Sequence, residues 1–105
     1  MIQPITSAVN DKGHLVVGGC DTVELAKQFG TPLYVLDIET IRSRVHDYQS
    51  IRATYPHVRI VYASKALSIT ALYQLLAEDG LYFDVVSDGE LFTLRHAGVS
   101  ATRAY

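Results

Sequence analysis

The chain has 105 residues, of which 49% are apolar and 19% charged, with a formal net charge of −2 and a pI near 6.0. This composition excludes a disordered chain, and the acidic balance argues against nucleic acid as the main partner. No apolar stretch approaches the roughly 20 residues that a membrane span needs, and the N-terminus lacks signal-peptide features. We therefore expect no membrane partner and a cytoplasmic location.

The first third of the chain predicts a strand, a helix and a second strand. Residues 15–17 (LVV) form an apolar run before two glycines, and Asp21 then opens a helix as its N-cap, with Glu24 placed for a capping box. Gly30 ends this helix, because the proline two residues later cannot continue it. We expect residues 33–36 (LYVL) to form the next strand.

From Asp37 onward, helix and strand patterns alternate. Asp37 can cap a helix whose apolar residues step by three or four as far as Tyr55. A strand is expected over residues 57–63, and an amphipathic helix follows from Ser68 and ends at Gly80. The last predicted elements are a strand over residues 82–86 and a helix capped by Ser87 and Glu90 and ended by Gly98.

Such alternation of nearly continuous apolar strands with helices is typical of an α/β fold, with a parallel sheet covered by helices. About three strand–helix units run from residue 33, and a fourth strand would begin at Ala104 and Tyr105. Three units cannot close an eight-stranded barrel, which takes about 250 residues. A three-layer domain complete at 105 residues is one interpretation. We favour the other, an N-terminal piece of a larger protein.

Lys65 is the main candidate for chemistry, because it lies directly after an apolar strand. Active sites of parallel α/β folds lie at the carboxyl ends of strands. We expect the amine to be desolvated there, which favours the neutral, nucleophilic form that a Schiff-base lysine needs. If the strand continues through Lys65, Ala63 shares its face and leaves room for a flat ligand. A solvated structural lysine is the alternative.

Asp84 is the second candidate and lies within the next apolar strand. Aspartate is disfavoured in strand interiors and is rarely buried without a partner. It could bind backbone groups or a helix N-terminus, or it could hold the ammonium of Lys65 when no cofactor is bound. Both interpretations predict low solvent access.

The other polar residues predict no site. The histidines lack the paired spacing of metal ligands, so we expect no metal; they are His14, His46, His57 and His96. Cys20 has no nearby histidine and is not expected to be a nucleophile. No P-loop and no GxGxxG pattern is present in the sequence.

Three ordered blocks resemble the start of diaminopimelate decarboxylase, a member of the fold-type III, alanine-racemase-like group of pyridoxal-phosphate enzymes. They are residues 31–35 (TPLYV), 62–66 (YASKA) and 80–91 (GLYFDVVSDGEL). The resemblance implies that Lys65 is the Schiff-base lysine for pyridoxal 5'-phosphate. It further implies that Ala63 lines the cofactor pocket and that Asp84 lies near the lysine and the ring.

For the fold, the resemblance implies that residues 31–105 are the first units of a truncated (β/α)8 TIM barrel. Residues 1–30 would belong with a second, mostly β domain. The full family forms homodimers and removes carbon dioxide from the D-centre of meso-diaminopimelate, which gives L-lysine. Its phosphate-binding and substrate-binding residues would follow Tyr105, so we expect the 105-residue chain to be inactive alone.

Three positions depart from the common family pattern: Ser64, Leu67 and Asp88 stand where valine, asparagine and glycine are frequent. These departures bear on the identity of the substrate more than on that of the cofactor, because Lys65 and Asp84 are both present. Ornithine, arginine or carboxynorspermidine decarboxylases, or a racemase of the same fold type, are therefore alternatives. A short non-catalytic protein that binds a partner is another.

Overall fold

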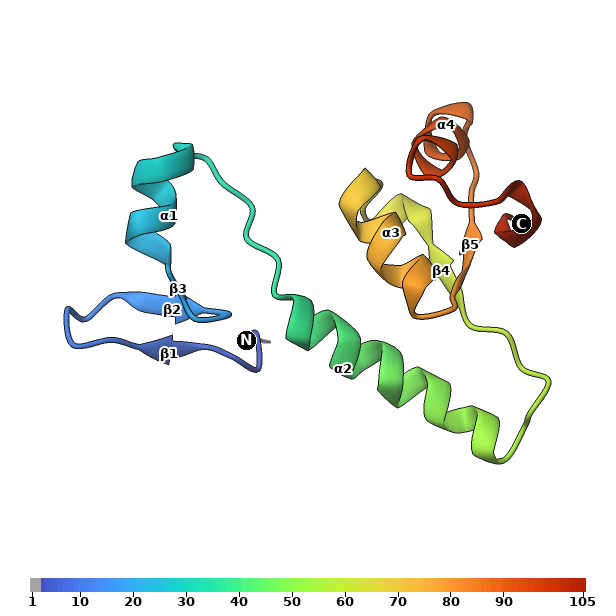
Figure 1. Ribbon diagram of the computed structural model, residues 1–105, viewed down its shortest axis with the longest axis horizontal. Helices are drawn as coiled ribbons and strands as arrows, with labels where there is room; N and C mark the ends of the chain where they lie inside the picture. Colours follow the sequence, from blue (N-terminus) through green and yellow to red (C-terminus); the bar gives the residue numbers. More distant parts are fainter. Residues whose placement is uncertain (1–2) are drawn as a thin grey trace. The chain divides into compact units, whose positions relative to one another are not determined.

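The computed structural model describes residues 3–105 (Figure 1). The chain divides into two compact units, Met1–Arg44 and Val45–Tyr105. The domain boundary that we expect after residue 30 concerns a longer protein and stays a prediction.

The first unit contains a small antiparallel sheet of three strands in the order β1-β2-β3 (Figure 1). The strands are β1 (Ala8–Val9), β2 (Leu15–Val17) and β3 (Cys20–Asp21). The predicted strand at residues 15–17 is confirmed as β2. Sequence patterns missed β1 and β3, because two residues are too few to show the alternation of a strand.

Helix α1 (Thr22–Phe29) begins and ends at the predicted residues. The Asp21 carboxylate accepts hydrogen bonds from the backbone N–H groups of Val23, at 2.9 Å, and Glu24, at 3.3 Å. At the other end Gly30 adopts φ +84°, a region that glycine enters without strain, and its N–H donates to a helix carbonyl. The side chain of Glu24 pairs with Lys27 at 2.8 Å.

The strand predicted at residues 33–36 is wrong. This segment has no regular structure, and Leu33, Tyr34, Val35 and Leu36 are between 39% and 97% exposed. An apolar run becomes a strand only when a neighbouring strand satisfies its backbone groups, and no described strand pairs with this one.

Helix α2 (Ile38–Gln49) follows, and the Asp37 carboxylate caps it by accepting from the backbone N–H of Thr40 at 3.3 Å. The helical prediction extended to Tyr55. The α-helix instead stops at Gln49 and continues as the 3₁₀ helix Ser50–Ala53.

In the second unit, β4 (Val61–Ala63) pairs in parallel with β5 (Tyr82–Asp84). The strand expected from residue 57 is therefore shorter. A third parallel segment begins at the predicted place, because Phe83 bridges Ala104 and the N–H of Tyr105 donates to the carbonyl of Phe83 at 2.8 Å.

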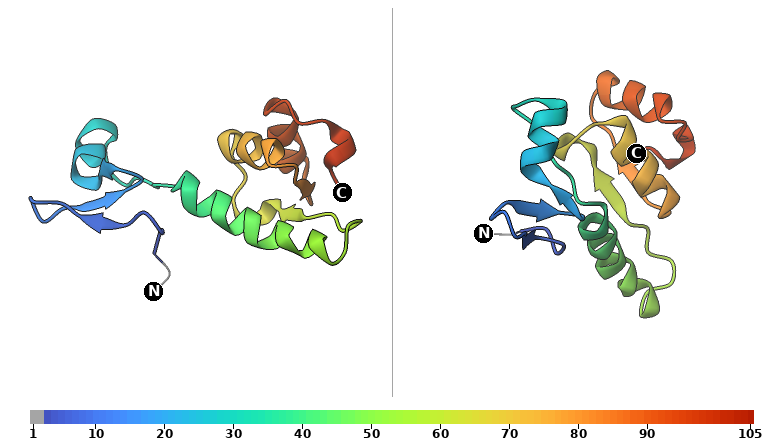
Figure 2. Two further views of the ribbon diagram at one scale, coloured as in Figure 1. Left: turned by 60° about the horizontal axis from the view of Figure 1, so that its bottom comes forward. Right: turned by 60° about the vertical axis from the view of Figure 1, so that its left-hand side comes forward.

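Helices α3 (Thr70–Glu78) and α4 (Asp88–His96) follow β4 and β5 and contact each other (Figure 2). Tyr73 of α3 meets Phe83 of β5 edge-on, with ring centroids 5.3 Å apart, and both side chains are fully buried. Leu94 anchors α4 in the same core and is also fully buried. The result is a mixed α/β arrangement, and residues 3–105 contain no closed barrel.

Candidate functional site

Strand register places Ala63 and Asp84 side by side, because they are direct partners in the β4–β5 pair. Tyr62 and Phe83 are the preceding partners, and Phe83 is fully buried against α3. Side chains alternate across a strand, so Ala63 and Asp84 belong to the opposite face. We call this opposite face, which also holds Val61 and Tyr82, the open face.

Lys65 follows the carboxyl end of β4 but is not part of the strand. The strand stops at Ala63, and Ser64–Ala66 form a 3₁₀ helix. The conditional expectation that strand alternation places Ala63 and Lys65 on one face therefore does not apply. Lys65 instead projects from a turn directly after Ala63, at the end of the sheet where parallel α/β folds place their chemistry.

One hydrogen bond and one buried residue hold this turn. The hydroxyl of Tyr62 donates to the carbonyl of Leu67 at 3.0 Å, which ties the end of the turn back to β4. Ser64 is only 1% exposed, and its hydroxyl has no hydrogen-bond partner among the described residues. Burial raises the pKa of the Tyr62 phenol. The turn is thus anchored on both sides of Lys65.

The expectation of low solvent access is wrong for both candidate residues. Lys65 and Asp84 are exposed, and the described contacts include no ion pair between them. The reason is that α3 packs on the Phe83 side of the sheet, whereas the open face is more accessible, with Val61 44% exposed.

Sequence reasoning missed a cluster at the start of the same strands. The Arg59 guanidinium lies 4.9 Å from the centroid of the Tyr82 ring and donates to the hydroxyl of Tyr105. This hydrogen bond is the main cause of a raised pKa for Arg59. The contact depends on how residues 104 and 105 pair with Phe83 of β5, which the sequence does not reveal.

Metal-binding clusters and membrane-spanning helices are both absent from residues 3–105. Nowhere in this range do three or more histidine, cysteine, aspartate or glutamate side chains gather in a way that could hold a metal ion. The described helices include none long and apolar enough to cross a membrane.

A family model described as "Pyridoxal-dependent decarboxylase, pyridoxal binding domain" matches residues 38–105. The chain belongs to the pyridoxal-dependent decarboxylase family. Lys65, Ala63 and Asp84 all lie within the matched range. The predicted resemblance to the fold-type III pyridoxal-phosphate decarboxylases is thereby confirmed for the family.

Individual relatives agree with the family. A diaminopimelate decarboxylase of Halalkalibacterium halodurans is 52% identical over 101 residues, which cover 95% of this chain and 23% of the relative. The Bacillus subtilis diaminopimelate decarboxylase is 46% identical over the same coverage. The resemblance to the N-terminal region of diaminopimelate decarboxylase is thus confirmed.

Two solved structures match the fold of this chain. A crystal structure titled diaminopimelate decarboxylase from "m. jannaschi" superposes with a TM-score of 0.82 at 36% identity, and it covers 94% of this chain and 24% of that one. AQ1208 from Aquifex aeolicus gives a TM-score of 0.79 at 37% identity, with the same coverage. The chain thus spans about a quarter of the length of the relatives that it matches.

Proposed function

We propose that this chain is the cofactor-attaching part of a meso-diaminopimelate decarboxylase, with Lys65 binding pyridoxal phosphate through its Nζ. The observation that supports the assignment best is the side-by-side placement of Ala63 and Asp84 on the open face, with Lys65 in the next turn. Family membership supports the cofactor, because the matched model is a pyridoxal-binding domain.

The residues present fit this cofactor. An accessible primary amine can bond to an aldehyde, and Ala63 leaves the open face free for a flat ring. Asp84 places a carboxylate on the neighbouring strand, where it can accept a hydrogen bond or balance a positive charge. When bound, pyridoxal phosphate supplies an electron sink for the carbanion that loss of carbon dioxide leaves behind. The turn held by Tyr62 keeps the Lys65 amine at the end of the sheet.

The proposed substrate is meso-diaminopimelate, which loses carbon dioxide from its D-centre to give L-lysine. The curated relatives at 52% and 46% identity are named diaminopimelate decarboxylases, which supports this choice. The proposal includes a complete (β/α)8 barrel, a second β domain, a cytoplasmic homodimer, and phosphate-binding and substrate-binding residues that follow Tyr105.

Covalent labelling tests the cofactor assignment on the chain itself. The chain is incubated with pyridoxal 5'-phosphate and reduced with borohydride, and the modified lysines are mapped by peptide mass. The chain has three lysines, so Lys12 and Lys27 act as internal controls. We expect label to accumulate on Lys65 in preference to both.

Variants sharpen this experiment. Lys65→Arg should remove the preferential label and leave that on Lys12 and Lys27 unchanged. Asp84→Asn and Ala63→Leu should each reduce the preference, because one neutralises the neighbouring carboxylate and the other fills the open face. Equal labelling of the three lysines in the unmodified chain would contradict the proposed site.

The substrate is tested on the complete product of the reading frame that encodes this chain. Release of carbon dioxide is measured with meso-diaminopimelate, ornithine, arginine and carboxynorspermidine. Highest kcat/KM with meso-diaminopimelate supports the proposal. A higher value with another substrate assigns the chain to a different decarboxylase with the same cofactor.

A further inference from the structure

Two tyrosines from different elements bind the segment that follows Lys65. The hydroxyl of Tyr62, in β4, donates to the carbonyl of Leu67 at 3.0 Å. The hydroxyl of Tyr73, in α3, lies 2.9 Å from Oγ of Ser68, and either oxygen can donate. Two consecutive residues are therefore bonded to two separate elements of the second unit. We call this pair of bonds the tyrosine clamp.

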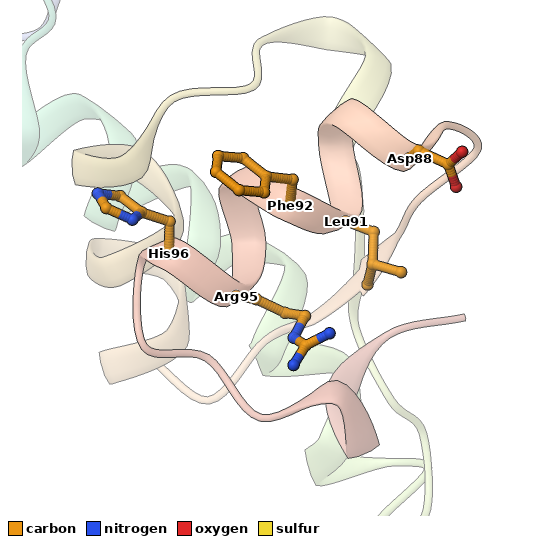
Figure 3. Close-up of a pocket in the computed structure, with 5 residues that line it drawn as sticks. All are labelled: Asp88, Leu91, Phe92, Arg95 and His96. Atoms are coloured by element: carbon orange, nitrogen blue, oxygen red, sulfur yellow. The ribbon is translucent and has the colours of Figure 1, made fainter.

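Burial fixes the position of the Tyr73 ring. Its side chain is fully buried and meets the equally buried Phe83 edge-on, with ring centroids 5.3 Å apart. By contrast, Phe92 of α4 is 71% exposed and lines a surface hollow together with His96 (Figure 3). The core thus determines where the Tyr73 hydroxyl lies. Because its contacts are internal to the second unit, they do not depend on what covers the outer faces of that unit.

Local structure alone does not hold the segment that the tyrosine clamp binds. Residues 67–69 connect the 3₁₀ helix Ser64–Ala66 to α3 and have no regular structure. Helix α3 begins after Ile69, whose apolar side chain accepts no hydrogen bond, so no side chain caps this end. The bond between Ser68 and Tyr73 instead fastens the chain just before the helix to a residue inside it.

We propose that Ser68 and Tyr73 are positioning residues for Lys65, because their hydroxyl pair completes the tyrosine clamp and so fixes the direction in which the turn presents the Lys65 amine. This inference rests on the proposed function, in which Lys65 binds pyridoxal phosphate. The two hydroxyls act through the backbone of residues 64–68. An amine on a long flexible side chain bonds to an aldehyde more readily when its backbone is already ordered, since less conformational freedom is then lost.

Borohydride labelling of the chain measures this effect as the ratio of label on Lys65 to label on Lys12 and Lys27. Tyr73→Phe and Ser68→Ala should each lower the ratio about fivefold, the factor that corresponds to the usual net free energy of one hydrogen bond. The double variant should lower it no further, because both changes break the same bond. Ser68→Thr retains a hydroxyl and should keep the ratio of the parent chain.

Matched controls separate positioning from a general loss of stability. Tyr48→Phe and Ser50→Ala make the same chemical changes at exposed residues of the second unit and should leave the ratio unchanged. Val99→Ala removes buried core contacts of the same unit, so it should lower the urea midpoint without lowering the ratio. Circular dichroism checks that each variant keeps its helices.

A second measurement does not involve the cofactor. Backbone order parameters from ¹⁵N relaxation should fall in Tyr73→Phe at residues 65–68, from about 0.85 towards about 0.6, and stay unchanged in β4 and β5. Unchanged values at residues 65–68 would overturn the tyrosine clamp.

The two measurements also separate this inference from the proposed function. Preferential label on Lys65 in the parent chain, with the same ratio in Tyr73→Phe, would overturn the positioning role and leave the cofactor site standing. Equal label on the three lysines of the parent chain would contradict the cofactor site. The order parameters would then decide on the tyrosine clamp alone, with lowered values supporting it and unchanged values overturning it.

Discussion

The hydroxyl of Tyr62 donates to the carbonyl of Leu67, and this bond closes the turn from which Lys65 projects. Tyr62 also lies beside Phe83 in the sheet, with ring centroids 6.4 Å apart. One tyrosine therefore links the packed face of the sheet to the turn that bears the candidate lysine.

Tyr62→Phe keeps the ring and removes the hydroxyl. We expect the free energy of unfolding to fall by about 1 kcal/mol, the usual net value of one hydrogen bond. The preference of pyridoxal phosphate for Lys65 should also fall, because the turn is no longer tied to β4. Urea unfolding and borohydride labelling measure the two effects. Tyr34→Phe, at a 97% exposed side chain, is the control. An equal effect of this control would show that the Tyr62–Leu67 hydrogen bond does not hold the turn.

The contacts of Asp21 predict that the first unit loses stability at acidic pH. Its carboxylate is 2.9 Å from Nδ1 of His14 and accepts from the Asn10 side chain at 2.7 Å. Chiefly because of the contact with His14, the pKa of Asp21 falls from its ordinary value of 3.8 to about 2.

A carboxyl group that is more acidic in the folded chain stabilises it above its ordinary pKa. For Asp21 this contribution is complete above about pH 4 and is lost as the pH falls towards 2. We therefore expect Asp21→Asn to reduce stability at pH 7 and to flatten its decline between pH 4 and 2. Urea titrations at a series of pH values measure this. Asp11→Asn should leave the decline unchanged, and an unchanged decline in Asp21→Asn would disprove the assignment.

Two phenylalanines of the second unit should respond very differently to truncation. Phe83 is fully buried, so Phe83→Ala should cost about 3–5 kcal/mol through lost contacts and the cavity left behind. Phe92 is 71% exposed, so Phe92→Ala should change stability by less than about 0.5 kcal/mol. Denaturant unfolding at micromolar protein compares them. Similar losses would show that the described core is wrong.

Ser87 caps α4, and its hydroxyl oxygen accepts from the N–H of Glu90 at 3.1 Å. Ser87→Ala should lower the free energy of unfolding by about 1 kcal/mol. Ser87→Asp retains an acceptor at the cap, so its free energy of unfolding should stay within a few tenths of a kcal/mol of the parent value. Thermal or urea unfolding measures both variants. Loss of stability in the aspartate variant equal to that in the alanine variant would argue against capping.

The sequence predicted the elements that local rules determine. Asp21 and Ser87 have short polar side chains that cap helices without help from distant residues, and both caps are confirmed. The capping box is realised differently, since the Glu90 carboxylate accepts from the N–H of Val86 at 2.7 Å. Such details depend on the path of the preceding chain.

Predictions failed where strand formation or burial depends on residues that are distant in the sequence. Residues 33–36 have the composition of a strand but no partner strand in the described chain. Burial of Lys65 and Asp84 was inferred from apolar neighbours in sequence, yet burial depends on what covers each face of the sheet. The pairing of Ala63 with Asp84 follows from strand register, which no local pattern specifies.

The alternation of side chains along β5 places adjacent residues on opposite faces of the sheet. Phe83 points into the packed interior, and Asp84, one residue later, belongs to the open face. Substitution of Phe83 removes core contacts, whereas substitution of the exposed Asp84 leaves the core intact. The residue proposed to face the cofactor can therefore vary without disturbing the fold of the unit, because alternate residues of each strand belong to the core and to the open face.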